Sequence, residues 1–353
     1  MVCTGKCFFF SQNLILELNL SIHKVGNKES DILSLSKAEI KINQELLELL
    51  NTYFLSPFKS EEYYQFNHDS DLALNEVYVY VSAIFDNPQL LHEESINLAK
   101  HLYNQSTHPK IKSGEFYVVY FKDTALNGER MDAVGLFKSE NKDTFLKIYP
   151  KEEGFEIESE QGVNVNKLDK GCIVFNTEKE TGYIVSVVDN TNKGTEARYW
   201  VDNFMHVRQR QDKYFNTENT LSLYKDYVVK QLPEEYNVTR ADQADFLNRS
   251  MKFFKEQEHF ELEAFKNEVL EYPEYIDSFN RYKEQYEKER SIEIAESFTI
   301  SDAAVKRQNR SYKSIIKLDR NFHIYVHGNR ELIEQGIDEK GRKFYKIYYE
   351  EEL

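Results

Sequence analysis

Cationic side chains gather in one segment near the end of the chain. The sequence from Ala303 to Arg330 contains seven Lys or Arg residues and one acid, Asp319, which gives a local charge of 7 − 1 = +6 in a chain whose net charge is −15. Lys and Arg are the side chains that most often contact nucleic-acid phosphates, and the Ser, Asn, Gln and Tyr residues between them can add hydrogen bonds. The seven candidate contacts are Lys306, Arg307, Arg310, Lys313, Lys317, Arg320 and Arg330.

The spacing of four of these cations bears on whether they act together. Successive members are separated by four, three and four residues, so one continuous helix would place them on a single face. If the helix stops near Tyr312, the last two belong to the strand that follows and the common face is lost. The four residues are Lys306, Arg310, Lys313 and Lys317.

A second, smaller group of cations lies in the middle of the chain, around an aromatic run. Its members alternate with glutamines in RQRQ, and aromatic rings beside Arg can stack on exposed bases. The alternative for both groups is that they form surface ion pairs with nearby acidic helices, because charge clusters are commonly solvated faces. The second group consists of Arg198, Arg208, Arg210 and Lys213.

One arrangement of carboxylates resembles an enzyme motif. Asp132 precedes Glu140-Asn141-Lys142, which mimics the acid and ExK pattern of nucleases that hold Mg²⁺ with carboxylates and orient water with a lysine. The ExK part is expected in the turn after a strand. It is also a common chance pattern in a chain with 60 acids and 45 bases. A metal-dependent nuclease is therefore the least favoured of three functions.

Other catalytic and metal-binding patterns are not found in the sequence. It has no GxxxxGK[ST] or GxGxxG phosphate loop and no GxSxG elbow. His323 and His327 lie four apart on an expected strand, but no third ligand follows them closely. Cys3 and Cys7 offer two thiols without a second pair. We therefore expect a protein that is not an enzyme and that needs no metal or cofactor.

The overall composition restricts the class of protein. Hydrophobic residues make up 41% of 353 residues, enough for a substantial core and for two or three domains. The net charge of −15 counts against a protein that coats itself with nucleic acid on every face, so a DNA-binding protein of this composition must concentrate its cations locally. Three cysteines fit a reducing cytosol. No apolar stretch approaches the roughly 20 residues that span a bilayer, and the start lacks a signal-peptide cleavage site. The expected location is cytoplasmic, without a membrane partner.

The periodicity of the sequence predicts an α+β fold. A strand is expected at 14–25, helices at 36–55 and 91–104, and then a run of short strands whose connections are too short for crossover helices, which favours an antiparallel meander. Gly182 is available for a positive φ in a turn over 178–182. The expected strands of the run cover 115–121, 133–138, 144–149, 154–159, 171–176 and 182–189.

Helical periodicity returns after this run of strands. One helix is expected over 217–231, ended by Pro233, and a longer one from a capping box at Thr239 to Tyr272, with its apolar stripe interrupted at Glu258. A further helix covers 274–296. A short helix capped by Ser301 and strands at 322–327 and 343–349 complete the chain.

We therefore expect a mixed or antiparallel sheet domain with flanking helices, then a charged helical region and a short β-containing segment. The corresponding domains are residues 1–200, an α+β domain with the antiparallel meander, 201–300, the helical region, and 301–353, a basic helix and strands.

Several segments together resemble the bacterial 37-kDa nucleoid-associated proteins (NdpA/YejK-like), in a form of the Bacteroidetes type. The resemblance covers nearly the whole chain, apart from the first dozen residues with CTGKC. It implies association with the nucleoid in the cytoplasm and DNA binding, and it supplies no catalytic signature. The segments that carry it are IHKVGNKESD (22–31), YYQFNH (63–68), EFYVVYFKD (115–123), MDAVGLFK (131–138), GCIVFNTEKETGYIVSVVDN (171–190), YWVDNFMHVRQRQDKYFN (199–216) and the stretch 297–326.

The leading hypothesis is a nucleoid-associated DNA-binding protein that contacts the phosphate backbone of duplex DNA through its basic clusters, with little sequence specificity. The alternative is a protein-interaction module whose acidic helices, such as 254–265, bind a basic partner. Two copies would double the phosphate contacts, which suits a homodimer, but the sequence fixes neither the oligomeric state nor the physiological role.

Overall fold

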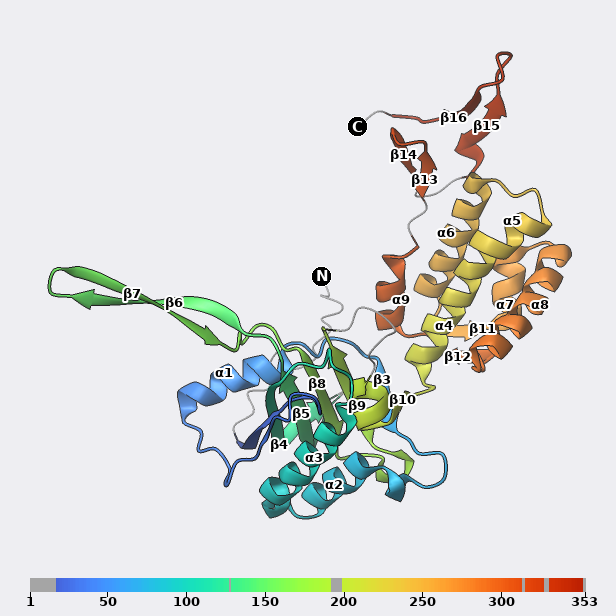
Figure 1. Ribbon diagram of the computed structural model, residues 1–353. Helices are drawn as coiled ribbons and strands as arrows, with labels where there is room; N and C mark the ends of the chain where they lie inside the picture. Colours follow the sequence, from blue (N-terminus) through green and yellow to red (C-terminus); the bar gives the residue numbers. More distant parts are fainter. Residues whose placement is uncertain (1–16, 127, 192–198, 313–314, 327–329, 352–353) are drawn as a thin grey trace, which may run out of the picture. The chain divides into compact units, whose positions relative to one another are not determined.

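The computed structural model describes residues 17–126, 128–191, 199–312, 315–326 and 330–351 (Figure 1). The chain divides into two compact units, an N-terminal unit that ends at Arg210 and a C-terminal unit that begins at Gln211. Both combine helices with antiparallel strands, so the predicted α+β class is confirmed.

The N-terminal unit is built on an eight-stranded sheet in the order β10-β3-β9-β8-β5-β4-β1-β2, with antiparallel neighbours throughout. The pairs β4–β5 and β8–β9 are consecutive along the chain, as the short connections of the meander predicted, but β5 pairs with β8 because the predicted strands at 144–149 and 154–159 leave the main sheet. The strands are β1 (Leu18–Val25), β2 (Leu33–Ser34), β3 (Tyr63–Phe66), β4 (Gly114–Leu126), β5 (Glu129–Ser139), β8 (Lys170–Phe175), β9 (Ile184–Asp189) and β10 (Val207–Gln209).

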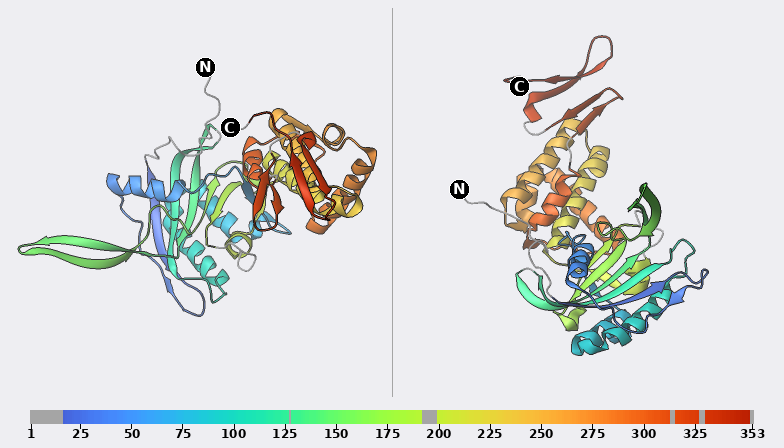
Figure 2. Two further views of the ribbon diagram at one scale, coloured as in Figure 1. Left: turned by 90° about the horizontal axis from the view of Figure 1, so that it is seen from above. Right: turned by 90° about the vertical axis from the view of Figure 1, so that its left-hand side faces the viewer.

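Helices cover both faces of this sheet, which gives the unit two hydrophobic cores (Figures 1 and 2). Alternate residues of β4 point to opposite faces, so Val118 packs with α2 and α3 while Val119 packs with Phe54 of α1. The helical elements are α1 (Gln44–Leu55), η1 (Leu72–Leu74), α2 (Glu76–Asp86), η2 (Pro88–Leu90), α3 (Leu91–Gln105), η3 (Lys179–Thr181) and the π-helical η5 (Tyr199–Met205).

The turn between β8 and β9 requires a glycine. Gly182 has φ = +98°, and a Cβ there would come within 2.4 Å of the Phe66 carbonyl oxygen. The positive φ predicted for Gly182 is confirmed. Between β5 and β8, the strands β6 (Asp143–Lys151) and β7 (Gly154–Gly162) form a separate two-stranded ribbon that extends away from the main sheet (Figure 1).

The C-terminal unit is a bundle of helices packed around an aromatic core that includes Tyr224, Phe254 and Phe265. Short antiparallel hairpins complete it. Its helical elements are α4 (Lys213–Asp226), η6 (Tyr227–Gln231), α5 (Leu232–Glu235), α6 (Arg240–Glu256), α7 (Leu262–Phe265), η7 (Lys266–Leu270), α8 (Pro273–Arg290), α9 (Asp302–Asn309) and η8 (Arg330–Leu332). Its strands are β11 (His259–Glu261), β12 (Ser297–Thr299), β13 (Ile315–Leu318), β14 (Phe322–Tyr325), β15 (Ile333–Ile337) and β16 (Lys343–Ile347).

Two predicted helices and one predicted strand have different bounds in the structure. The helix expected from residue 36 begins at Gln44, because the Asn43 side chain caps it by accepting a hydrogen bond from the Leu46 N–H. Pro233 does not end its helix, since it stands in the first turn of α5, where a missing N–H costs little. The predicted strand at 14–25 begins outside the described residues, and its visible part is β1.

The long helix expected from Thr239 to Tyr272 is interrupted near Glu258, as its imperfect stripe had suggested. The capping box at Thr239 is confirmed, but α6 ends at Glu256 and the chain then extends into β11. Phe260 of β11 is fully buried and stacks on Phe254 and Phe298, so the tertiary core overrides helical continuity here. The acidic stretch 254–265 is therefore not one helix.

Candidate nucleic-acid interface

The first basic cluster begins on α9, which is short. Ser301 caps it by accepting a hydrogen bond from the Ala304 N–H, and the helix ends at Asn309. Lys317 then lies on β13, so the single helical face that would have joined it to Lys306 and Arg310 does not form. Lys313 lies outside the described residues.

The cations of α9 differ in their surroundings. Lys306 and Arg310 are exposed. Arg307 is exposed too, but its guanidinium donates to the Tyr214 hydroxyl at 2.8 Å and lies 3.6 Å from the Glu218 carboxylate. Part of its positive charge is therefore compensated within the unit.

The hairpin β13–β14 presents a cationic and aromatic face. Residues directly opposite in an antiparallel pair share a face, so Lys317 lies beside His323, and Ile315 beside Tyr325. The other face carries Ile316, which is buried against α6. Lys317, His323 and Tyr325 are exposed, as is Arg320 in the connecting turn.

These cations are spread along α6. Asn309, at the end of α9, accepts a hydrogen bond from Lys255 near the C-terminal end of α6. The hairpin packs through Ile316 with Ala241 and Ala244 near the N-terminal end. Eleven to fourteen helical residues separate the two anchor points, a distance of roughly 20 Å at 1.5 Å per residue. The first cluster is therefore an elongated series of charges and not a compact patch.

Arg330 is held by the protein itself. Its Nε lies 2.5 Å from an Asp242 carboxylate oxygen, and Nη1 donates to the Ile333 carbonyl. Asp242 is also the third residue of the Thr239 capping box. Arg330 and Asp242 lie in the wall of a cavity of about 470 Å³ in the C-terminal unit. The arrangement gives Arg330 a structural partner.

Replacing Asp242 with alanine is expected to destabilise the C-terminal unit by about 1–2 kcal/mol, the usual cost of a lost cap. Burial raises the pKa of Asp242, but hydrogen bonds from Thr239 and Arg330 outweigh it and leave that pKa lowered. The contribution is thus present at neutral pH and lost as the pH falls through the lowered pKa. Urea unfolding followed by circular dichroism at pH 7 and pH 3 measures it. Asp277→Ala, at an exposed carboxylate of α8, is the control, and equal losses in both variants would contradict the prediction.

The second basic cluster is divided between the two units. Arg208 and Arg210 belong to the N-terminal unit, and Lys213 is the first residue of α4 in the other. Arg208 and Lys213 are exposed, whereas Arg210 pairs with Glu178 at 2.8 Å. Arg198 lies outside the described residues.

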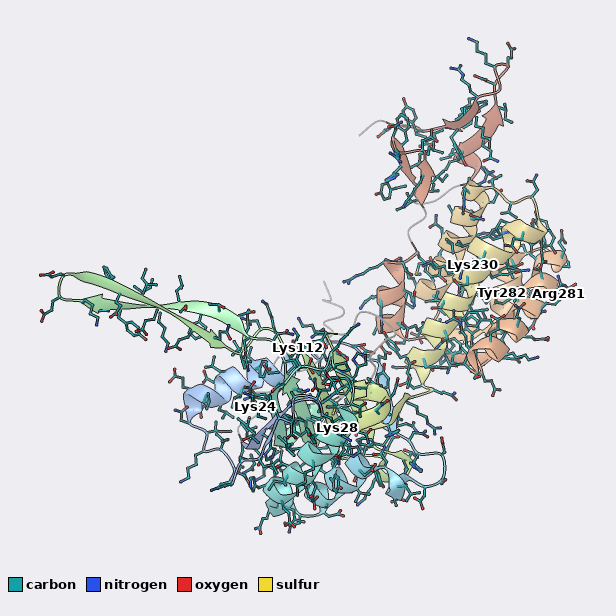
Figure 3. The ribbon with its side chains drawn as sticks, viewed as in Figure 1. Lys24, Lys28, Lys112, Lys230, Arg281 and Tyr282 are labelled. Atoms are coloured by element: carbon teal, nitrogen blue, oxygen red, sulfur yellow. The ribbon has the colours of Figure 1, made fainter. Side chains whose placement is uncertain are left out.

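Charge counting along the sequence missed three exposed lysines of the N-terminal unit. Figure 3 shows Lys24, Lys28 and Lys112 on this unit, on β1, in the turn after it and just before β4. Within the described part of the chain, no carboxylate lies at ion-pair distance from any of them. Lys112 lies far beyond Lys28 along the chain, and the pairing of β1 with β4 brings the segments that carry these lysines into one sheet, so a count along the sequence does not group Lys112 with the other two.

The two cations that Figure 3 labels in the C-terminal unit, Lys230 and Arg281, form ion pairs with carboxylates of the same unit. Lys230 lies 3.1 Å from Asp226, and Arg281 lies 3.2 Å from Glu235. These two cations provide a contrast with Arg310 and with the exposed cations of the β13–β14 hairpin.

Comparison with known families accounts for most of the chain. The family model described as nucleoid-associated protein YejK matches residues 21–342. The chain belongs to this family of nucleoid-associated proteins. The resemblance inferred from the sequence segments is thus confirmed, and the matched range includes both units and both basic clusters. A comparison with curated proteins gives no match.

The nuclease-like residues of this family member are not arranged as a metal site. Asp132 lies in β5 and Glu140 directly follows its last residue, eight residues further on, which is roughly 26 Å in an extended strand. Asp132 accepts a hydrogen bond from the Tyr120 hydroxyl at 2.6 Å, and Lys142 pairs with Glu115. Among the residues described, no three His, Cys, Asp or Glu side chains are placed to hold a metal ion.

Glu140 belongs to a buried ionic network. Its two carboxylate oxygens each lie 3.1 Å from a lysine Nζ, one on Lys138 and one on Lys170, and the Tyr199 hydroxyl donates to it at 2.8 Å. The side chains of the two lysines are at most 2% exposed and that of Glu140 is 6% exposed. Asp169 accepts the backbone N–H groups of Glu140 and Asn141. Glu140 thus neutralises two lysines inside the protein, a structural role.

In the part of the chain that the structure describes, no helix combines the length and the apolar character of a membrane span.

Proposed function

We propose that this member of the nucleoid-associated family binds duplex DNA through its phosphate backbone, with little sequence specificity, in the nucleoid of the cytoplasm. The contacts are drawn from the eleven cations of the two clusters. The β13–β14 hairpin carries the proposal, because it presents Lys317, Arg320, His323 and Tyr325 together to solvent. Contacts between such cations and DNA phosphates do not depend on the base sequence.

Five of the eleven cations form the core of the proposed contact set, because they are exposed and no carboxylate of the described residues lies within ion-pair distance of them. Arg307, Arg210 and Arg330 have acidic partners in the protein and take a secondary part. The five are Arg310, Lys317, Arg320, Arg208 and Lys213.

The salt dependence of DNA binding tests this proposal. Five phosphate contacts predict a slope of about −4.5 in a plot of log association constant against log salt concentration, since each contact contributes about −0.9. Fluorescence anisotropy with a labelled duplex of mixed sequence, titrated between low and physiological salt, measures the slope. A second duplex of unrelated sequence should bind equally well. No binding to either duplex at low salt would refute the proposal.

The proposal includes a homodimer, since a second copy doubles the number of phosphates engaged. The alternative of a module that binds a basic protein loses its clearest support, because 254–265 is not one acidic helix. The exposed carboxylates of Glu256 and Glu258 remain available to such a partner. Protein that shifts no DNA but co-purifies with a basic protein would favour this alternative.

A further inference from the structure

The two strands β6 and β7 form a ribbon of residues 143–162 with two different faces. Directly opposed residues share a face, and the register pairs Leu146 with Ser159, Ile148 with Ile157 and Pro150 with Phe155. This face, called the apolar ribbon face below, carries no charged side chain between Leu146 and Phe155. The other face carries ion pairs, Lys147–Glu160 at 2.5 Å and Lys151–Glu156 at 2.7 Å.

The apolar ribbon face is open to solvent. Leu146, Ile148, Phe155 and Ile157 are 60–77% exposed, although they are the kind of side chain that folding normally buries. The ribbon forms a sheet of its own, and Figures 1 and 2 show it extending away from the body of the N-terminal unit. Within the described chain, no helix or strand covers this face.

The charge of the ribbon makes it a poor ligand for DNA. Residues 143–162 contain six acids and two lysines, which gives 2 − 6 = −4. A β-ribbon that follows a nucleic-acid groove needs cations to balance phosphate. The same negative charge disfavours anionic lipid surfaces. The occupant of this face is therefore a protein surface that is itself apolar.

We propose that the occupant is the same apolar ribbon face of a second copy of the chain. The two ribbons stack antiparallel around a two-fold axis that passes at Ile148 and Ile157. Each Phe155 then lies over the small Ser159 of the second copy, and each Leu146 over the second copy's Pro150. Large side chains thus meet small ones, as an isologous interface requires.

Antiparallel stacking also limits the repulsion between the two negatively charged ribbons. The ion pairs of the strands stay on the outer faces, in water. Glu152 and Glu153 lie at the tip of each ribbon, and antiparallel stacking carries the two tips to opposite ends. Like charges are therefore separated along the length of the ribbon, roughly 30 Å for nine residues at 3.4 Å each.

The area is sufficient for a specific interface. The four exposed side chains present about 450–500 Å² per copy, taking on the order of 150–200 Å² for a large side chain. Two copies bury about 1,000 Å² through these residues alone, and the flanking Pro150, Ser159, Thr144 and Gln161 bring the total near the roughly 1,200 Å² at which stable interfaces begin. Such a patch is also as large as the largest on typical monomers.

The inference specifies the surface of the homodimer in the proposed function, yet it is tested in the absence of DNA, so the two can fail separately. The full chain is examined by sedimentation velocity, where a dimer of the 41.9 kDa chain is expected. Ile148→Ser with Ile157→Ser should weaken dimerisation at least a hundredfold. Phe145→Ser with Tyr149→Ser removes apolar side chains from the other face and should leave the dimer unchanged.

A cross-linking experiment locates the axis independently. In a chain with Cys3→Ser and Cys7→Ser, whose remaining Cys172 is buried, Ile148→Cys should give a covalent dimer with a short bismaleimide. Tyr149→Cys, on the opposite face, should not. Fluorescence of Trp200 confirms that each variant keeps a folded N-terminal unit. A monomeric wild type at tens of micromolar, or a dimer that survives Ile148→Ser with Ile157→Ser, overturns the inference.

Discussion

Replacing Glu140 with glutamine is expected to destabilise the N-terminal unit by roughly 3–5 kcal/mol, the usual cost of removing one partner from a buried ion pair. Glu140 is the carboxylate that both Lys138 and Lys170 contact, and all three side chains are nearly inaccessible to water. Glutamine keeps the shape but leaves two buried ammonium groups with less compensation. The loss follows from desolvated charge and not from a cavity.

The pH dependence of this loss has a definite sign. Burial lowers the pKa of Lys138, and attraction to Glu140 opposes that lowering in the wild type. Without Glu140 the folded-state pKa of Lys138 falls further below its unfolded value, so the unfolded chain binds more protons. Stability of the variant should therefore rise as the pH increases from 7 toward 10.

Urea unfolding monitored by tryptophan fluorescence measures the stability of the N-terminal unit, in which Glu140 lies. Trp200 is the single tryptophan of the chain, is fully buried in the N-terminal unit and follows Tyr199 of the network. Glu115→Gln removes a carboxylate from the more accessible Lys142 pair and should cost no more than about 1 kcal/mol. Equal effects of the two substitutions would show that Glu140 does not neutralise buried charge.

Local sequence signals predicted much of the fold. Alternation and short connections identified the strands that became β4 to β9, and side-chain caps at Thr239 and Ser301 marked helix starts that the structure confirms. Errors arose where distant residues decide the outcome. The break after Glu256 depends on the stacking of Phe260 with Phe298, which lies 38 residues further along the chain.

The candidate site was less accessible to sequence reasoning. A linear count found the cations near α9, but it treated Arg330 and Arg210 as equivalent to Arg310 and Arg320, although the fold gives the first two carboxylate partners. Those partners, Asp242 and Glu178, lie 88 and 32 residues away along the chain. Charge compensation is a property of the tertiary structure, and composition alone does not contain it.

The ExK motif is a second case in which the tertiary structure, and not the residue types alone, decides what a side chain does. Asp132 and Glu140 have the residue types of a magnesium site, but an extended strand holds them apart. Glu140 is instead surrounded by Lys138 and Lys170, which β5 and β8 bring together in register. A pattern of residue types indicates a metal site only when the fold brings those side chains close enough to bind the same ion.

Replacing Arg310, Lys317 and Arg320 with glutamine together should lower duplex affinity by roughly 500-fold at about 0.1 M salt. Each lost phosphate contact lowers the log association constant by about 0.9 for every tenfold dilution of salt below about 1 M. At about 0.1 M salt, the loss of three contacts therefore lowers the log association constant by about 2.7. The slope of the log–log salt plot should become shallower by the same amount. Glutamine keeps a polar side chain at these exposed positions, so folding should be unaffected.

The matched control removes the same number of charges from another surface of the same unit. Lys230→Gln, Arg281→Gln and Lys288→Gln act on η6 and α8, where Lys230 and Arg281 already face Asp226 and Glu235. If general attraction to the whole protein governed binding, both triple variants would lose affinity equally, because their net charges are identical. If local phosphate contacts govern it, the control keeps its slope and the α9–hairpin variant does not. Equal slopes in wild type and both variants would exclude this surface as the DNA contact, because counterion release counts the phosphates that the protein touches.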